Sequence, residues 1–170
     1  MQTNGTIDIT EQFGTHLAGQ YLTFVLSGEE YCVALSKVQQ IIQLEPITKV
    51  PLSPPFILGV INLRGKVVPV VDLRVKFDMT VSQNTEITCM VVLQLSSSDS
   101  PFTVAFLIDE VKEVTRINEE SIEDVPEFGA SLDVSFLMGV AKINDTVRML
   151  LDIDKLFSLE ELNRIDSLQE

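Results

Sequence analysis

Residues 56–77 read FILGVINLRGKVVPVVDLRVKF, and this stretch decides the fold. Two runs rich in β-branched residues, Ile57–Leu63 and Val67–Val71, flank a turn at residues 64–66. β-Branched residues favour the pleated surface of a strand, and glycine supplies the positive φ that a short hairpin turn needs. The second run carries apolar groups on both faces, whereas a strand with one wet face alternates. The stretch therefore predicts a hairpin that is covered on both faces, with Arg64 at its tip.

The same pattern returns in residues 136–157, which read FLMGVAKINDTVRMLLDIDKLF. Laid under the first stretch without gaps, it aligns glycine with glycine, aspartate with aspartate and phenylalanine with phenylalanine at an offset of 80 (139 minus 59). A weaker match relates residues 33–41 to residues 106–114 at an offset of 73 (106 minus 33). We interpret the chain as two copies of one β unit packed together.

The spacing of the expected strands predicts an all-β protein of about ten short strands, arranged as two small barrels rather than one wide sheet. Ser158 begins a capping-box pattern, and leucine or isoleucine recurs every three residues after it, which predicts a C-terminal helix. The expected organisation is a mobile tail at 1–20, a main domain at 21–157 with its first barrel mainly at 21–84 and its second mainly at 85–153, strand exchange being left open, and a helix at 154–170.

Four further elements are expected. Some precede the central hairpin, and the others lie between it and its repeat. Residues 88–95 and 102–108 should form a second hairpin, because both runs are rich in valine, leucine and phenylalanine. Residues 36–40 and 109–113 should form short turns at equivalent places of the two copies, and residues 47–50 a short strand.

The composition limits the partners and the compartment. The chain has 170 residues, is 45% apolar and carries a formal net charge of −13. This charge is unsuited to nucleic acid or anionic lipid and favours a basic or arginine-bearing protein surface as the partner. Cys32 and Cys89 lie in apolar strand segments, as reduced, buried thiols of a cytosolic protein do. Without a signal-peptide pattern or an apolar run of about 18 residues, we expect a cytoplasmic protein with no direct membrane insertion.

Residues that could carry catalysis are few, and each has a plainer interpretation. His16, the only histidine, lies in the expected tail, which does not hold the geometry of proton transfer. The glycine-rich run at 59–67 has five residues between its glycines and ends in Val67, where a phosphate loop needs Ser or Thr. Ser97 lacks the surroundings of a nucleophile, no Cys/His cluster has metal-ligand spacing, and the paired carboxylates at 109–110 and 119–120 are interpreted as solvated charges. We therefore expect no enzymatic activity, no cofactor and no metal.

Arg64 has two interpretations. It is either an ordinary solvated turn residue or an anchor at a protein interface, where arginine is enriched and makes charge-assisted hydrogen bonds. The equivalent position of the repeat is Asn144, so the turn itself does not require the charge. This comparison favours the interface.

The central hairpin closely resembles the signature of the CheW family, the bacterial chemotaxis coupling proteins. Residues 30–41 (EYCVALSKVQQI), 108–114 (IDEVKEV), 136–143 (FLMGVAKI) and 150–156 (LLDIDKL) carry the same resemblance, which extends roughly over residues 21–157. It implies two intertwined five-stranded SH3-like β-barrels without catalytic activity. At this length a stand-alone adaptor is indicated, rather than a kinase or a receiver-domain fusion.

The resemblance also implies partners and sites. Family members link the cytoplasmic tips of chemoreceptors to the regulatory domain of a CheA-type histidine kinase, in receptor arrays at the membrane. By resemblance, Val38, Gln40, Gly59 and Arg64 fall on receptor-binding positions, and Phe128 falls near a kinase-contact region. The family often has glutamate where this chain has Gln40, which puts the preferred receptor or kinase in doubt.

Two rival functions stay open. One is a CheW-like scaffold of another chemosensory pathway, serving motility or biofilm formation. The other is a small-ligand-binding β-barrel, which requires an apolar pocket with converging titratable groups. The sequence offers no such groups that converge.

Overall fold

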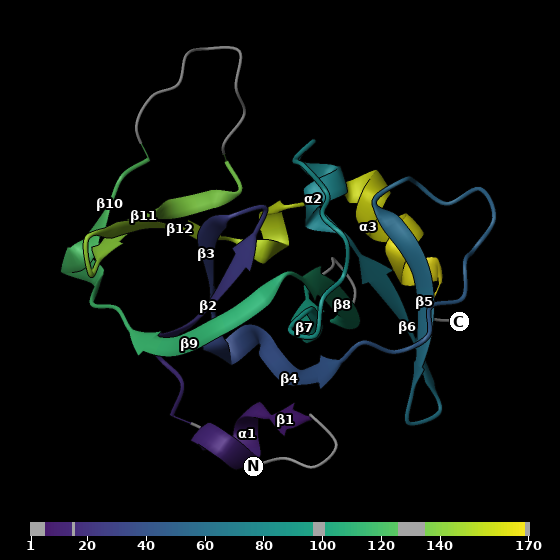
Figure 1. Ribbon diagram of the computed structural model, residues 1–170, viewed down its shortest axis with the longest axis horizontal. Helices are drawn as coiled ribbons and strands as arrows, with labels where there is room; N and C mark the ends of the chain where they lie inside the picture. Colours follow the sequence, from purple (N-terminus) through teal and green to yellow (C-terminus); the bar gives the residue numbers. More distant parts are fainter. Residues whose placement is uncertain (1–5, 15, 97–100, 126–134, 169–170) are drawn as a thin grey trace.

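The computed structural model describes residues 6–14, 16–96, 101–125 and 135–168, and these form two mixed sheets with short helices at their margins (Figure 1). The strand order of the first sheet is β1 (Ile7–Asp8), β4 (Val38–Gln43), β7 (Cys89–Leu95), β8 (Phe102–Ile108), β6 (Lys66–Val71) and β5 (Ile57–Leu63). The order of the second is β10 (Ile122–Glu123), β11 (Leu137–Ile143), β12 (Thr146–Leu151), β3 (Glu29–Ala34), β2 (Gln20–Leu26) and β9 (Glu110–Arg116). The helices are α1 (Ile9–Phe13), α2 (Leu73–Lys76) and α3 (Leu159–Ser167), with 3-10 turns η1 (Leu35–Lys37), η2 (Glu119–Ser121) and η3 (Ile153–Lys155).

The two halves of the chain exchange strands. The first sheet combines β4, β5 and β6 of the first half with β7 and β8 of the second, and the second sheet combines β9 to β12 with β2 and β3. The sheets therefore do not follow the expected division at residues 84 and 85, because each half gives its first hairpin to the other sheet. Without the two-residue strands β1 and β10, each sheet has five strands, and the fold is the predicted pair of intertwined SH3-like barrels.

The pairing registers confirm the internal repeat. The β5–β6 hairpin is irregular between Ile57 and Gly59, and the β11–β12 hairpin has the same irregularity between Leu137 and Gly139. Both hairpins then join a parallel partner, β8 in the first sheet and β3 in the second. A shared irregularity is a stronger sign of repetition than shared valines, because a bulge is a specific local geometry.

Gly59 and Gly139 each allow another segment to cross close to their hairpin. A Cβ added to Gly59, whose φ is +148°, would overlap the carbonyl oxygen of Thr48. A Cβ on Gly139 would lie 2.7 Å from the carbonyl oxygen of Glu123 in β10.

The strand expected at residues 47–50 is reduced to one bridge between Thr48 and Val60, since proline at positions 46 and 51 interrupts the ladder.

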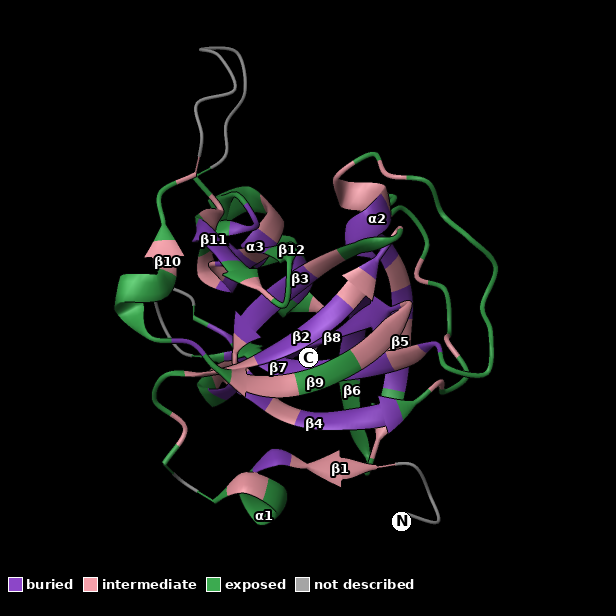
Figure 2. Ribbon diagram, turned by 60° about the vertical axis from the view of Figure 1, so that its left-hand side comes forward, coloured by how far each residue is buried: buried purple, intermediate pink, exposed green. Residues whose placement is uncertain are grey.

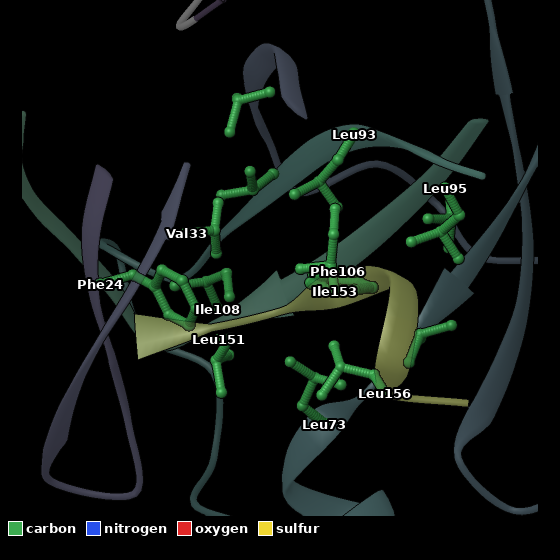
Figure 3. Close-up of a cluster of buried hydrophobic side chains, with 14 of the residues drawn as sticks. Phe24, Val33, Leu73, Leu93, Leu95, Phe106, Ile108, Leu151, Ile153 and Leu156 are labelled. Carbon is green, nitrogen blue, oxygen red and sulfur yellow. The ribbon is translucent and has the colours of Figure 1, made fainter. Parts of the chain in front are cut away.

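The main core lies between the two sheets and draws side chains from both halves of the chain (Figure 3). Phe24 and Val33 of the second sheet, and Phe106 and Ile108 of the first, are almost completely buried there. A smaller apolar cluster around Val68 and the residues next to it in space belongs to the first barrel, and another around Cys32 belongs to the second. Because the large core is shared, the two barrels stabilise each other.

The prediction of a tail without structure is wrong for residues 7–13. β1 pairs with β4, α1 follows it, and both lie against that edge of the first sheet (Figures 1 and 2). The Asp8 side chain accepts a hydrogen bond from the Glu11 backbone N–H at 3.1 Å and so caps α1. Ile9 is fully buried in the main core, which explains why so short a segment is held.

Two predicted turns are also corrected. Residues 109–113 were expected to form a short turn, but β9 runs on to Arg116 as an edge strand. Its sequence, EVKEVTR, is charged as edge strands often are, and Figure 2 shows it as a strand of intermediate and exposed residues. In the first copy the turn ends at Lys37, and β4 begins at once with Val38.

The predicted C-terminal helix is present but begins later than residue 154. The 3-10 turn η3 comes first, and Ser158 then caps α3 with both hydrogen bonds of the capping box to Glu161. No helix in the described part of the chain is long and apolar enough to cross a membrane.

Candidate protein-interaction groove

A groove of about 530 Å³ opens beside the tip of the β5–β6 hairpin. It brings together three of the residues that the family resemblance marks as receptor-binding, namely Val38 and Gln40 from β4 and Arg64 from the hairpin turn. We call it the Arg64 groove and define it by Asp8, Val38, Gln40, Arg64, Lys66, Val68 and Thr103. Four segments distant in sequence therefore meet at one surface.

The hairpin turn holds Arg64 in an exposed position with a left-handed backbone. Arg64 has φ 54° and Gly65 has φ 83°, the pattern of a tight two-residue turn. The Asn62 side-chain oxygen accepts a hydrogen bond from the Gly65 backbone N–H at 2.7 Å and stabilises the turn. The equivalent turn of the second copy uses Asn144 and Asp145, the residue types that best tolerate this conformation.

Replacing Arg64 with asparagine is therefore expected to raise the free energy of unfolding by about 0.5–1 kcal/mol, because asparagine adopts the left-handed conformation more readily. Urea unfolding measures the change. Asn144→Arg in the second hairpin is the matched control and should lower stability by a similar amount. If Arg64→Asn destabilises the protein, Arg64 contributes to the stability of the fold. Its presence at this turn then needs no functional explanation.

The groove has both apolar and polar side chains in its lining, and two basic side chains stand at its hairpin end. Val38 and Val68 are buried at its base, and Gln40 is 9% exposed. At the rim, the Lys66 ammonium donates to the Thr103 hydroxyl at 3.4 Å, next to exposed Arg64. A chain with a net charge of −13 thus presents two cations side by side at this one hairpin.

The remaining predicted site residues lie elsewhere. Gly59 is buried and does not line the Arg64 groove, and its position is explained by the close approach of Thr48. Phe128 and Ser97 lie outside the described residues. The sequence prediction omitted Lys66 and Asp8, and only the position of Lys66 beside Arg64 gave a signal that could have found one of them.

The described residues contain no group of three or more His, Cys, Asp or Glu side chains that could hold a metal ion. His16 is exposed, and its carbonyl oxygen accepts a hydrogen bond from the Gln20 side chain at 3.1 Å. Burial raises the pKa of the Cys32 thiol, an effect partly offset by its hydrogen bond with Thr23. These groups do not come together as a reacting centre.

Cys89 is expected to react slowly with iodoacetamide in the folded protein. Burial raises the pKa of its thiol to about 11, so little of the reactive thiolate exists near neutral pH. In a Cys32→Ser variant at pH 8, we expect alkylation to be about tenfold slower, or more, than in urea, after allowing for the higher nucleophilicity of a more basic thiolate. The rate should rise steadily up to pH 10, and a rate that stays flat between pH 8 and 10 would contradict the assignment.

The comparisons with known proteins agree with this architecture. The family model described as the CheW-like domain matches residues 20–161. The Chemotaxis protein CheW of Klebsiella aerogenes is 34% identical over 163 residues, which cover 96% of this chain and 96% of that protein. The Chemotaxis protein CheW of Helicobacter pylori is 30% identical over 137 residues, covering 81% of this chain and 80% of that protein.

A solved structure has the same fold. The crystal structure of the scaffolding protein TtCheW from Thermoanaerobacter tengcongensis superposes with a TM-score of 0.73 at 29% identity, covering 84% of this chain and 94% of that chain. The likeness thus extends over both barrels and the hairpins that define the repeat. The chain therefore belongs to the CheW-like family of chemotaxis scaffold proteins.

Proposed function

We propose that this protein is a non-enzymatic adaptor that couples the cytoplasmic tips of chemoreceptors to the regulatory domain of a CheA-type histidine kinase. The observation that carries the proposal is the Arg64 groove, which Val38 and Gln40 of β4 line together with Arg64 of the distant hairpin turn. Kinase control would then be geometric, because the adaptor fixes the place of the kinase relative to the receptor. The protein would work in the cytoplasm at membrane-associated receptor arrays.

The physical character of the groove supports a protein partner. A surface that combines buried apolar side chains with polar ones suits a protein interface, and arginine at its edge can make charge-assisted hydrogen bonds. A standard interface covers about 800 Å² of each partner. The chain exposes 9856 Å² in all, so a receptor and a kinase can occupy separate surfaces. Gly59 as a receptor-binding residue and Phe128 as a kinase contact remain predictions.

The test is calorimetry with a fragment containing the hairpin tip of a chemoreceptor. Arg64→Asp is expected to weaken binding by about tenfold to a hundredfold, because it reverses the charge at the rim of the groove. Lys142→Asp is the matched control, since Lys142 is an exposed cation on the equivalent hairpin of the second barrel. Equal affinity of wild type and Arg64→Asp would refute the site.

The coupling itself is tested by gel filtration of the adaptor with the receptor fragment and the kinase regulatory domain. A ternary complex is expected for the wild type, and only the receptor should be lost from it with Arg64→Asp. A wild-type protein that binds neither partner would refute the adaptor function. Whether the pathway serves chemotaxis or another chemosensory output follows from which receptor binds.

A further inference from the structure

Each side of the Arg64 groove has a counterpart in the second barrel. β4 and β9 carry the same bulge, opposite β7 and β2 respectively, and this places Gln40 and Glu113 at equivalent positions. The two long hairpins, offset by 80 residues, likewise place Val68 and Arg148 at equivalent positions. The groove and its counterpart can therefore be compared residue by residue.

A hydrogen bond repeats with the same offsets. In the first barrel the Lys66 ammonium donates to the Thr103 hydroxyl at 3.4 Å. In the second barrel the equivalent residues are Thr146 and Glu30, and the Thr146 hydroxyl donates to a Glu30 carboxylate oxygen at 3.1 Å. Two equivalent side-chain contacts show that the correspondence holds for the side chains as well as for the backbone.

In the second barrel the equivalent of the groove is filled by Arg148. Its Nε donates to Glu30 at 3.1 Å, and its Nη1 donates to Glu113 at 3.1 Å and to the Thr23 hydroxyl at 2.9 Å. The residue is only 4% exposed. The position that buried Val68 occupies in the lining of the Arg64 groove is thus held by an arginine in the second barrel, whose guanidinium is bound by the protein's own side chains.

The charges around this place are reversed between the two barrels. The second barrel surrounds its arginine with carboxylates, whereas the first has neutral side chains there and cations at the hairpin turn. The equivalent pairs, second barrel first, are Glu113 and Gln40, Glu30 and Thr103, Asn144 and Arg64, and Thr146 and Lys66. Asp8 is the acidic residue among those that define the groove, and its Oδ1 accepts the backbone hydrogen bond that caps α1.

We propose that the Arg64 groove receives one carboxylate-bearing side chain of the bound partner above Val68, where the second barrel holds Arg148. Arg64, Lys66 and the Gln40 amide supply the charge and the donors that such a side chain needs. In the second barrel Arg148 already occupies the equivalent position. Of the two equivalent positions, only the one in the first barrel can therefore receive a partner's carboxylate. This inference rests on the proposed function for the identity of the partner.

The first test fills the Arg64 groove with the side chains that fill its counterpart in the second barrel. A triple variant, Gln40→Glu, Thr103→Glu and Val68→Arg, copies the second barrel's arginine and its carboxylates into the groove, and Val68→Met narrows the groove without a charge. We expect the triple variant to bind the receptor-tip fragment about tenfold more weakly or worse, and Val68→Met to lose about threefold or more. Thermal unfolding checks that each variant is folded, and Val68→Met decides alone if the triple variant is not.

The second test identifies the occupant. Each acidic residue of the receptor-tip fragment is changed to its amide, and affinity is measured against wild type and against Lys66→Gln. One change should cost about tenfold with wild type and clearly less with Lys66→Gln, which is the coupling expected of direct partners.

The outcomes separate this inference from the function on which it rests. If wild type binds the fragment but the folded triple and Val68→Met variants bind equally well, or no acidic residue shows coupling, the occupant is wrong and the adaptor function stands. If wild type does not bind a receptor tip at all, both are overturned.

Discussion

Replacing Arg74 with methionine is expected to lower the free energy of unfolding by about 3–5 kcal/mol, because the buried carboxylate of Asp72 and the half-buried one of Asp109 would lose their cation. The Arg74 side chain is 2% exposed. Its Nε and Nη2 donate to the two carboxylate oxygens of Asp72 at 3.0 and 2.9 Å, and its Nη1 donates to Asp109 at 2.6 Å. The other Asp109 oxygen accepts from the Ser27 backbone N–H at 2.7 Å.

This network joins three places that are far apart in sequence, namely the segment from the end of β6 into α2, the junction of β8 with β9 and the turn between β2 and β3. The large expected effect follows from burial, since exposed ion pairs contribute about 1 kcal/mol or less. Arg164→Met is the control, because Arg164 is exposed and, among the described residues, donates to the Leu52 carbonyl oxygen at 3.1 Å and to no carboxylate. Urea unfolding that shows equal losses for the two variants would mean that the Arg74 network does not hold the halves together.

Gly59→Ala is expected to cost about 3 kcal/mol, for two reasons that act together. The φ of +148° is unfavourable for any residue with a Cβ, and that Cβ would overlap the Thr48 carbonyl oxygen. Gly65→Ala separates the two reasons, because Gly65 has φ +83° but nothing within 4 Å of an added Cβ. We expect this control to lose about 1 kcal/mol.

Thermal unfolding of both variants measures the difference, and equal losses would show that the backbone crossing at Thr48 is not tight.

The result also bears on the receptor-binding prediction for Gly59. Because Gly59 does not line the Arg64 groove, any loss of receptor binding in Gly59→Ala should follow the loss of folded protein. A fully folded Gly59→Ala protein that fails to bind would instead support a direct contact.

The sequence was most informative where hydrophobic pattern and turn chemistry agreed. The central hairpin and its repeat are β-branched runs around turns that need a left-handed residue, and both formed as predicted. β9 was missed because its charged sequence does not look like a strand, although an edge strand needs only one covered side. β1 and α1 were missed because one buried isoleucine, Ile9, anchors a segment that is otherwise polar.

The site was only partly accessible from sequence. The family resemblance indicated Val38, Gln40 and Arg64. However, no short-range sequence pattern predicts that β4 and the hairpin turn line the same groove. The burial of Arg148 had no local signal either, because its carboxylate partners come from other strands, whereas Arg74 has one of its partners, Asp72, only two residues away. Only the alignment of the two copies, which sets Arg148 against Val68, hinted that one of these arginines is unusual.

The exchange of first hairpins between the halves has a consequence for the origin and the dissection of this protein. A chain cut between β6 and β7 would give two fragments. Each sheet takes strands from both of them, so neither fragment alone could form a complete five-stranded barrel. Such fragments should reassemble when mixed and stay unfolded when apart. By the same logic, a gene encoding one unit alone would make a protein that exchanges its first hairpin with an identical chain, so the present chain has the form of a tethered, domain-swapped dimer.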